Sequence, residues 1–111
     1  MNRHSELHNE NNFDTVLSNA IDNALTGLGE PVKKILFYHI QNKFLMKPED
    51  IPKNPDLFVL ALKNLLGAGS SHVETLILEE VCRTYKLDSA CFLNKRFDEA
   101  IEIIRKEIGE T

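Results

Sequence analysis

The chain has 111 residues, of which 42% are hydrophobic and 27% are charged, as expected for one globular domain. Against 17 Asp and Glu there are only 13 Lys and Arg, and the net charge of -4 leaves no basic surplus for binding nucleic-acid phosphates. No apolar run approaches the roughly 18 residues of a membrane span, and Cys82 and Cys91 are too few for a disulfide framework. These features predict a cytoplasmic protein that binds neither nucleic acid nor membrane.

The first residues of the chain are almost entirely polar and rich in Asn. Such a segment buries too little surface to offset the entropy lost on ordering, so residues 1–12 are predicted to be a flexible tail. Residues 13–111 then form a single domain. His4 and His8 have the spacing of two metal ligands on one helix face, but a tail without a helix does not hold them together, and we expect no metal site.

Hydrophobic periodicity predicts five helices, because apolar residues recur at i, i+3, i+4 and i+7 in five segments. No alternating run of β-branched residues competes with this pattern, so the predicted fold class is all-α, a compact bundle of about five helices. Prolines and glycines mark most of the boundaries. The predicted helices are 13–28, 30–45, 55–66, 71–87 and 95–108.

Apolar residues surround the axis of the helix predicted for 55–66, and they also point nearly all round the axis of the helix predicted for 30–45. A helix that is apolar on most sides is usually a central one, so we expect the helix 30–45 in the middle of the bundle. After this helix, Pro48, Pro52 and Pro55 exclude a continuous helix and leave room for one short turn at 48–51.

The core of the bundle is predicted from the same patterns. Ser71 and Glu74 have the spacing of a capping box at the start of the fourth helix, and Cys82 is expected to be a small buried side chain. The predicted centre of the core consists of Leu36, Ile40, Phe58, Leu62, Leu65, Ile77 and Val81.

Residues that carry chemistry are present, but their spacing does not indicate a site. His39 has no carboxylate nearby in the sequence to orient it, and Cys82 lies late in its helix, where the helix dipole does not activate a thiol. Cys91 lies in a loop without an activating neighbour, and the glycine-rich segment 67–71 lacks the lysine of a phosphate-binding loop. We therefore predict no catalytic, cofactor-binding or metal-binding residue, and no enzyme.

The helix 95–108 carries a narrow apolar stripe whose members are spaced 4, 3 and 4 residues apart, as in the seam of a coiled coil. Either this stripe closes the bundle over the first helix of its own chain, or it packs at least partly on a second copy. Ile103 lies off the stripe and would stay exposed in a helix buried only on its own core. The predicted interaction face therefore consists of Phe97, Ile101, Ile103, Ile104 and Ile108.

Segments in the middle of the chain resemble a known family. They are Leu28 to Ile40 (LGEPVKKILFYHI), Pro48 to Pro52 (PEDIP), Leu62 to Gly69, and Val73 to Leu78 (VETLIL). Together they resemble the Nitrosopumilus-type output domain family, whose members are small archaeal proteins or terminal modules of archaeal signalling proteins. The resemblance implies a cytoplasmic, signalling-associated helical module, and it carries over no catalytic residues.

The sequence supports two functions of different classes. The first is a non-enzymatic interaction or output module that binds another protein, or itself, through a helical face. The alternative is a small-ligand sensor or enzyme with a pocket between helices near His39 and Tyr38. A polar-lined pocket at these two residues would favour the alternative, whereas a closed core with an exposed apolar groove would favour the interaction module.

Overall fold

The computed structural model describes residues 13–92 and 94–109, so the predicted tail, residues 1–12, lies outside the described part of the chain. Within the described residues there are five α-helices and no strands, which confirms the all-α prediction. The α-helices are α2 (Phe13–Thr26), α3 (Glu30–Phe44), α4 (Pro55–Leu66), α5 (Ser70–Tyr85) and α6 (Phe97–Glu107). The 3-10 helices between them are η1 (Pro48–Lys53), η2 (Gly67–Gly69) and η3 (Ser89–Cys91).

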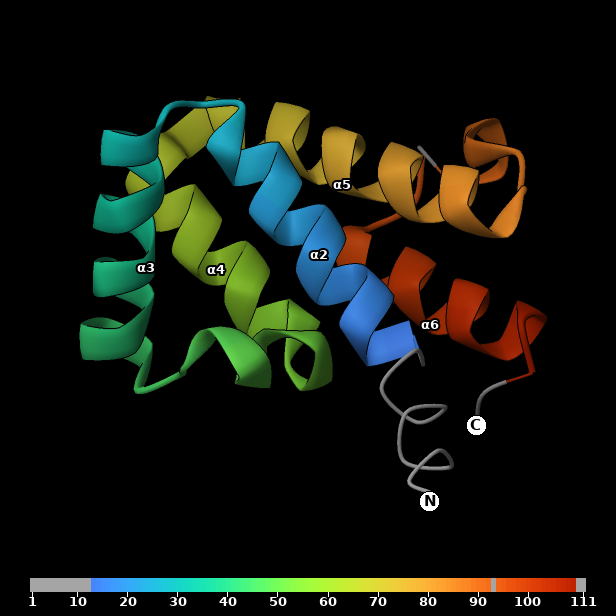
Figure 1. Ribbon diagram of the computed structural model, residues 1–111, viewed down its shortest axis with the longest axis horizontal. Coiled ribbons are helices and arrows are strands. Elements are labelled where there is room, and N and C mark those ends of the chain that lie inside the picture. The colour runs from blue at the N-terminus through green and yellow to red at the C-terminus, as the bar shows by residue number, and fades with distance from the viewer. Residues whose placement is uncertain (1–12, 93, 110–111) are drawn as a thin grey trace, which may run out of the picture.

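The helices form a bundle that measures 41 × 33 × 22 Å. Figure 1 shows α2 crossing the molecule diagonally, with α5 along one side, α3 at one end and α6 near the other end. α4 packs against α3, α5 and α6, whereas α3 packs chiefly against α4 and α2. None of the helices in the described ranges is long and apolar enough to cross a membrane.

The prediction that the helix 30–45 is central is wrong, because α3 lies at the edge of the bundle. Only Leu36 and Ile40 of this helix are buried, whereas α2 buries most of its apolar residues. α4, whose apolar residues also surround its axis, packs against three helices, α3, α5 and α6, and buries Phe58, Ala61 and Leu62. The apolar residues on the outer side of α3 therefore remain at the surface.

The predicted core is largely confirmed. Leu65 is only half-buried and packs against the core, while Cys82 is buried and Cys91 is exposed, as expected for each thiol. The fully buried members of the predicted core are Leu36, Ile40, Phe58, Leu62, Ile77 and Val81.

The capping box predicted at Ser71 and Glu74 does not form. α5 begins at Ser70, directly after η2, and the Ser70 N–H donates to the carbonyl oxygen of Gly67. Because the 3-10 turn provides a backbone acceptor at the helix start, no side-chain cap is required there. The Glu74 carboxyl is left half-buried, and its Oε2 has no hydrogen-bond partner in the described part of the chain.

Two helices end at a residue with left-handed backbone conformation. Leu45 follows α3 with a φ of 54°, and Lys86 follows α5 with a φ of 59°. Helices usually place Gly or Asn at such a position, because a side chain with a Cβ costs roughly 1–2 kcal/mol in this conformation. The left-handed Lys86 ends α5 at Tyr85, before the predicted end at 87.

Candidate interaction face on α3

The structure places the interaction face predicted on α6 mostly inside the chain's own core. Phe97, Ile101 and Ile104 are at most 2% exposed, and Ile103 and Ile108 are half-buried against the same core. Their helix packs on α4 and α5. The stripe with coiled-coil spacing on α6 is thus already covered within the chain.

A second set of residues with coiled-coil spacing lies on the outer side of α3. Its members are spaced 4, 3, 4 and 3 residues apart, which places the four within α3 on one helix face at a and d positions of a heptad, and the fifth, Leu45, directly after the helix end. All of them are exposed, in contrast to the stripe on α6. We call this set the α3 seam, and it consists of Pro31, Ile35, Tyr38, Asn42 and Leu45.

The exposure of the α3 seam is unusual for apolar residues of this size. Ile35 is 57% exposed, Tyr38 71% and Leu45 86%. Within the described ranges, the other large hydrophobic side chain that is exposed is Leu60 on α4. Single apolar residues scattered over a surface are normal, but a row of them along one helix face is typical of an interaction site.

A hollow of about 350 Å³ lies at the C-terminal end of the seam and is lined by Gln41, Asn42, Leu45 and Lys47. Asn42 is held against its own helix, because its Nδ2 donates to the carbonyl oxygen of Tyr38 at 2.8 Å. The hollow therefore combines one apolar side chain with two amides and an ammonium group, which suits contact with an amphipathic partner.

Lysine side chains flank the α3 seam. Residues 31–47 include four lysines and no Asp or Glu, although the whole chain has a net charge of -4. Lys33 is neutralised within the chain, since its Nζ lies 2.7 Å from Oδ1 of Asp22 on α2, and this hydrogen bond raises the pKa of Lys33. Lys34 and Lys47 are exposed, and no carboxylate of the described residues forms an ion pair with them.

Tyr38 and His39, the residues proposed to line a ligand pocket, lie on different sides of α3. Tyr38 belongs to the exposed seam, whereas His39 is half-buried with its ring edge-on to Phe44, at 6.1 Å between ring centres. The His39 Nε2 is shielded from solvent, and it has no hydrogen-bond partner among the described residues. The two side chains therefore do not face a common ligand.

Two neighbouring carboxyl groups have pKa values displaced in opposite directions. Burial raises the pKa of Glu74 on α5, and hydrogen bonds from Arg96, the shorter at 2.7 Å, lower the pKa of Asp98 on α6. Such a pair is a candidate acid and base. However, Asp98 lines a hollow formed by α4, α6 and the residue before α6, whereas the free oxygen of Glu74 is buried. An ion pair at the start of α6 and a half-buried acid account for both shifts.

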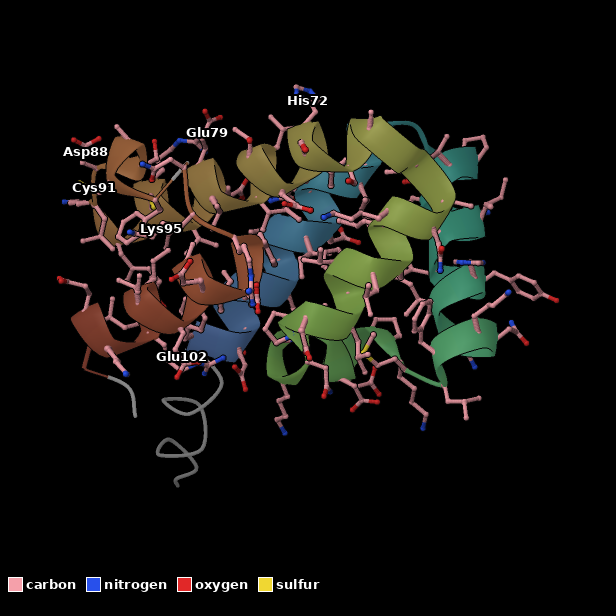
Figure 2. The ribbon with its side chains drawn as sticks, turned by 180° about the vertical axis from the view of Figure 1, so that it is seen from behind. His72, Glu79, Asp88, Cys91, Lys95 and Glu102 are labelled. Atoms are coloured by element: carbon pink, nitrogen blue, oxygen red, sulfur yellow. The ribbon has the colours of Figure 1, made fainter. Side chains whose placement is uncertain are left out.

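The remaining side chains that could take part in chemistry lie far from α3. Figure 2 shows Asp88, Cys91 and Lys95 at the opposite end of the molecule, where they line a hollow of about 330 Å³. Asp88 accepts a hydrogen bond from the Ala90 N–H at 3.1 Å and so stabilises the turn. Cys82 is buried, and this burial raises the pKa of its thiol, whereas Cys91 is exposed and is the more accessible of the two thiols.

Comparison of the chain with protein-family models, with curated proteins and with solved structures gave no match. The resemblance to the Nitrosopumilus-type output domain family therefore stays a prediction. The site on α3 thus has to be interpreted from its own geometry and charge.

The α3 seam was not predicted as an interaction face from the sequence, because a helix that is apolar all round indicates burial. Two signals for it were nevertheless present in the sequence. The heptad spacing of Ile35, Tyr38, Asn42 and Leu45 continues across the helix end, and residues 31–47 lack acidic side chains.

Proposed function

We propose that this chain is a non-enzymatic interaction module that binds another protein, or a second copy of itself, through the α3 seam. The observation that carries the proposal is the strong exposure of Ile35 and Tyr38 on one face of α3 and of Leu45 directly after the helix end. Rows of this kind are typical of helices that pair with a partner helix or lie in its groove. Covering them in a complex would contribute roughly 1.5–3 kcal/mol for each side chain that becomes fully buried.

The place of α3 in the bundle supports the same function. This helix lies at one end of the molecule, with its inner side packed on α4 and α2 (Figure 1). A partner helix can lie along the outer side without displacing any element of the fold. The resemblance noted in the sequence adds a proposed context, in which the module transmits an output in archaeal cytoplasmic signalling.

Tyr38 favours this function over a ligand pocket. A tyrosine that binds a small ligand is normally enclosed in a concave site, whereas this side chain is 71% exposed. A tyrosine at the surface suits protein recognition, since it supplies a large apolar ring and a hydroxyl group with little loss of side-chain entropy.

The proposed function is tested by site-specific photo-cross-linking in the native host. A benzophenone amino acid replaces Tyr38 in one variant and His72, an exposed residue on the outer side of α5, in a matched control (Figure 2). We expect a protein adduct from position 38 that is absent from position 72. No adduct from position 38, or the same adducts from both positions, would overturn the proposal.

A further inference from the structure

We infer that the partner of the α3 seam is an acidic amphipathic helix of another protein. This inference rests on the proposed function and adds the chemistry of the partner. Three features carry it: the heptad spacing of the seam, the unpaired lysines beside it and the amide side chains within it.

The spacing of the seam selects a helix as the partner. Ile35 and Asn42 occupy a positions and Tyr38 occupies a d position of a heptad, which is the register that receives knobs from a second helix, and Leu45 follows the helix end at heptad spacing. The seam spans about two heptads, since α3 has 15 residues and Leu45 follows it directly. A row this narrow contacts one helix along its length.

The charge of the flanking residues selects an acidic partner. Lys34 precedes Ile35 and therefore occupies a g position, from which side chains contact the flank of a facing helix. Lys47 lines the hollow beside Leu45 at the other end of the seam. Because neither lysine forms an ion pair with a described carboxylate of this chain, Glu or Asp on the partner would complete both ends of the contact.

The same charges disfavour a second copy on this face. A dimer formed by two α3 seams brings together two segments that contain lysines and no acidic residue between 31 and 47. Like charges across an interface suppress that pairing.

The amides disfavour a lipid surface. Gln41 and Asn42 lie between Tyr38 and Leu45, where their amide groups interrupt the apolar row that would otherwise enter the acyl region of a bilayer. A helix that lies on a membrane also needs a broad apolar face opposite its charges. On α3 two of the large apolar residues, Leu36 and Ile40, are buried in the protein's own core and cannot contribute to such a face.

The test uses two synthetic helical peptides of about three heptads with Leu at a and d. One carries Glu at its e and g positions and its twin carries Lys, and binding of each labelled peptide to the intact chain is followed by fluorescence anisotropy. We expect the Glu peptide to bind about tenfold or more tightly than the Lys peptide, and its affinity to fall as salt is added. Equal binding of the two peptides would overturn the inference.

Two charge-reversed variants localise the effect. The Lys34→Glu/Lys47→Glu variant should lose the preference for the Glu peptide, and Lys95→Glu/Lys106→Glu, with the same change in net charge at the other end of the molecule, should keep it. Equal losses in both variants would overturn the inference, because they would show a general charge effect. Circular dichroism on each variant checks that the fold is intact.

The competing occupants are measured on the same protein. Binding to phosphatidylserine vesicles with no response to either peptide, or a dimer in sedimentation that blocks the Glu peptide, would overturn the acidic-helix inference. Its failure is distinguishable from failure of the proposed function. If Tyr38 cross-links a protein whose capture is unchanged by Lys34→Glu/Lys47→Glu, the interaction module stands and the acidic partner does not.

Discussion

Arg105 on α6 donates from Nη1 to Oδ1 of Asp14 on α2 at 3.0 Å, across 91 residues of sequence. Its Nη2 donates to the carbonyl oxygen of Pro52 in η1 at 3.2 Å, and its guanidinium carbon lies 4.7 Å from the centre of the Phe13 ring. One side chain thus joins α6 to two other elements of the bundle. This network fixes α6 on its own chain, in agreement with the burial of its apolar stripe.

We expect the Arg105→Lys variant to lower the free energy of unfolding by about 1–3 kcal/mol. Lysine keeps the charge but cannot donate to Asp14 and Pro52 at once, and the Asp14–Arg105 pair is largely shielded from water. Urea unfolding of both proteins measures the difference. Arg96→Lys is the control, since Arg96 is exposed in its pair with Asp98 and its substitution should have a much smaller effect on stability. Equal effects at the two sites would contradict the assigned role of Arg105.

Leu62 and Leu60 provide a matched pair on α4. Leu62 is fully buried and Leu60 is 53% exposed, so the same substitution removes the same atoms from different surroundings. Leu62→Ala should cost about 2–5 kcal/mol through lost burial and a cavity, whereas Leu60→Ala should cost less than about 1 kcal/mol. Chemical denaturation of the two variants gives both values. A loss below about 1 kcal/mol for Leu62→Ala would contradict the burial of this side chain in the core.

Glu74→Gln should stabilise the protein at neutral pH. Burial raises the pKa of Glu74 above its ordinary value of 4.5, so the folded state binds its proton more tightly than the unfolded state does. The ionised carboxylate therefore destabilises the fold as the pH rises above 4.5 through the raised pKa, and Gln removes this penalty. Thermal unfolding should show a higher Tm for Glu74→Gln at pH near 7 and a smaller difference at pH near 4. A gain in Tm from Glu74→Gln that grows as the pH falls would mean that the pKa of Glu74 is not raised in the folded state.

The sequence predicted the fold class and most of the core because both follow from the period of apolar residues. That period indicates how much of a helix is apolar, but it does not say how much of an all-round apolar helix the other helices cover. α3 and α4 both have this character, and only the packing decides between them. The error about α3 therefore concerned tertiary arrangement and not helix formation.

The candidate site was mispredicted for a related reason. The 4, 3, 4 spacing on α6 and the 4, 3, 4, 3 spacing on α3 look equivalent in the sequence. The network of Arg105 with Asp14 and Pro52 joins α6 to segments that lie far away in the sequence. No local pattern therefore predicts that the apolar stripe on α6 is covered within the chain. Charge distinguishes the two helices, because α3 contains one acidic and three basic side chains whereas α6 contains four acidic and two basic ones.

Leu45 links stability to the proposed function in one experiment. It combines a left-handed backbone with 86% exposure, so Leu45→Gly removes both a conformational strain and an exposed apolar side chain. We expect a net stabilisation of about 0.5–1 kcal/mol, after the greater entropy of glycine in the unfolded chain is deducted. Lys86→Gly, at the other left-handed position, should give a similar gain. Cross-linking from the benzophenone amino acid at position 38 should fall about tenfold when Leu45→Gly is added and stay unchanged when Lys86→Gly is added, because only Leu45 belongs to the seam. A stabilised Leu45→Gly variant that still captures its partner in full would show that this leucine is not a binding residue.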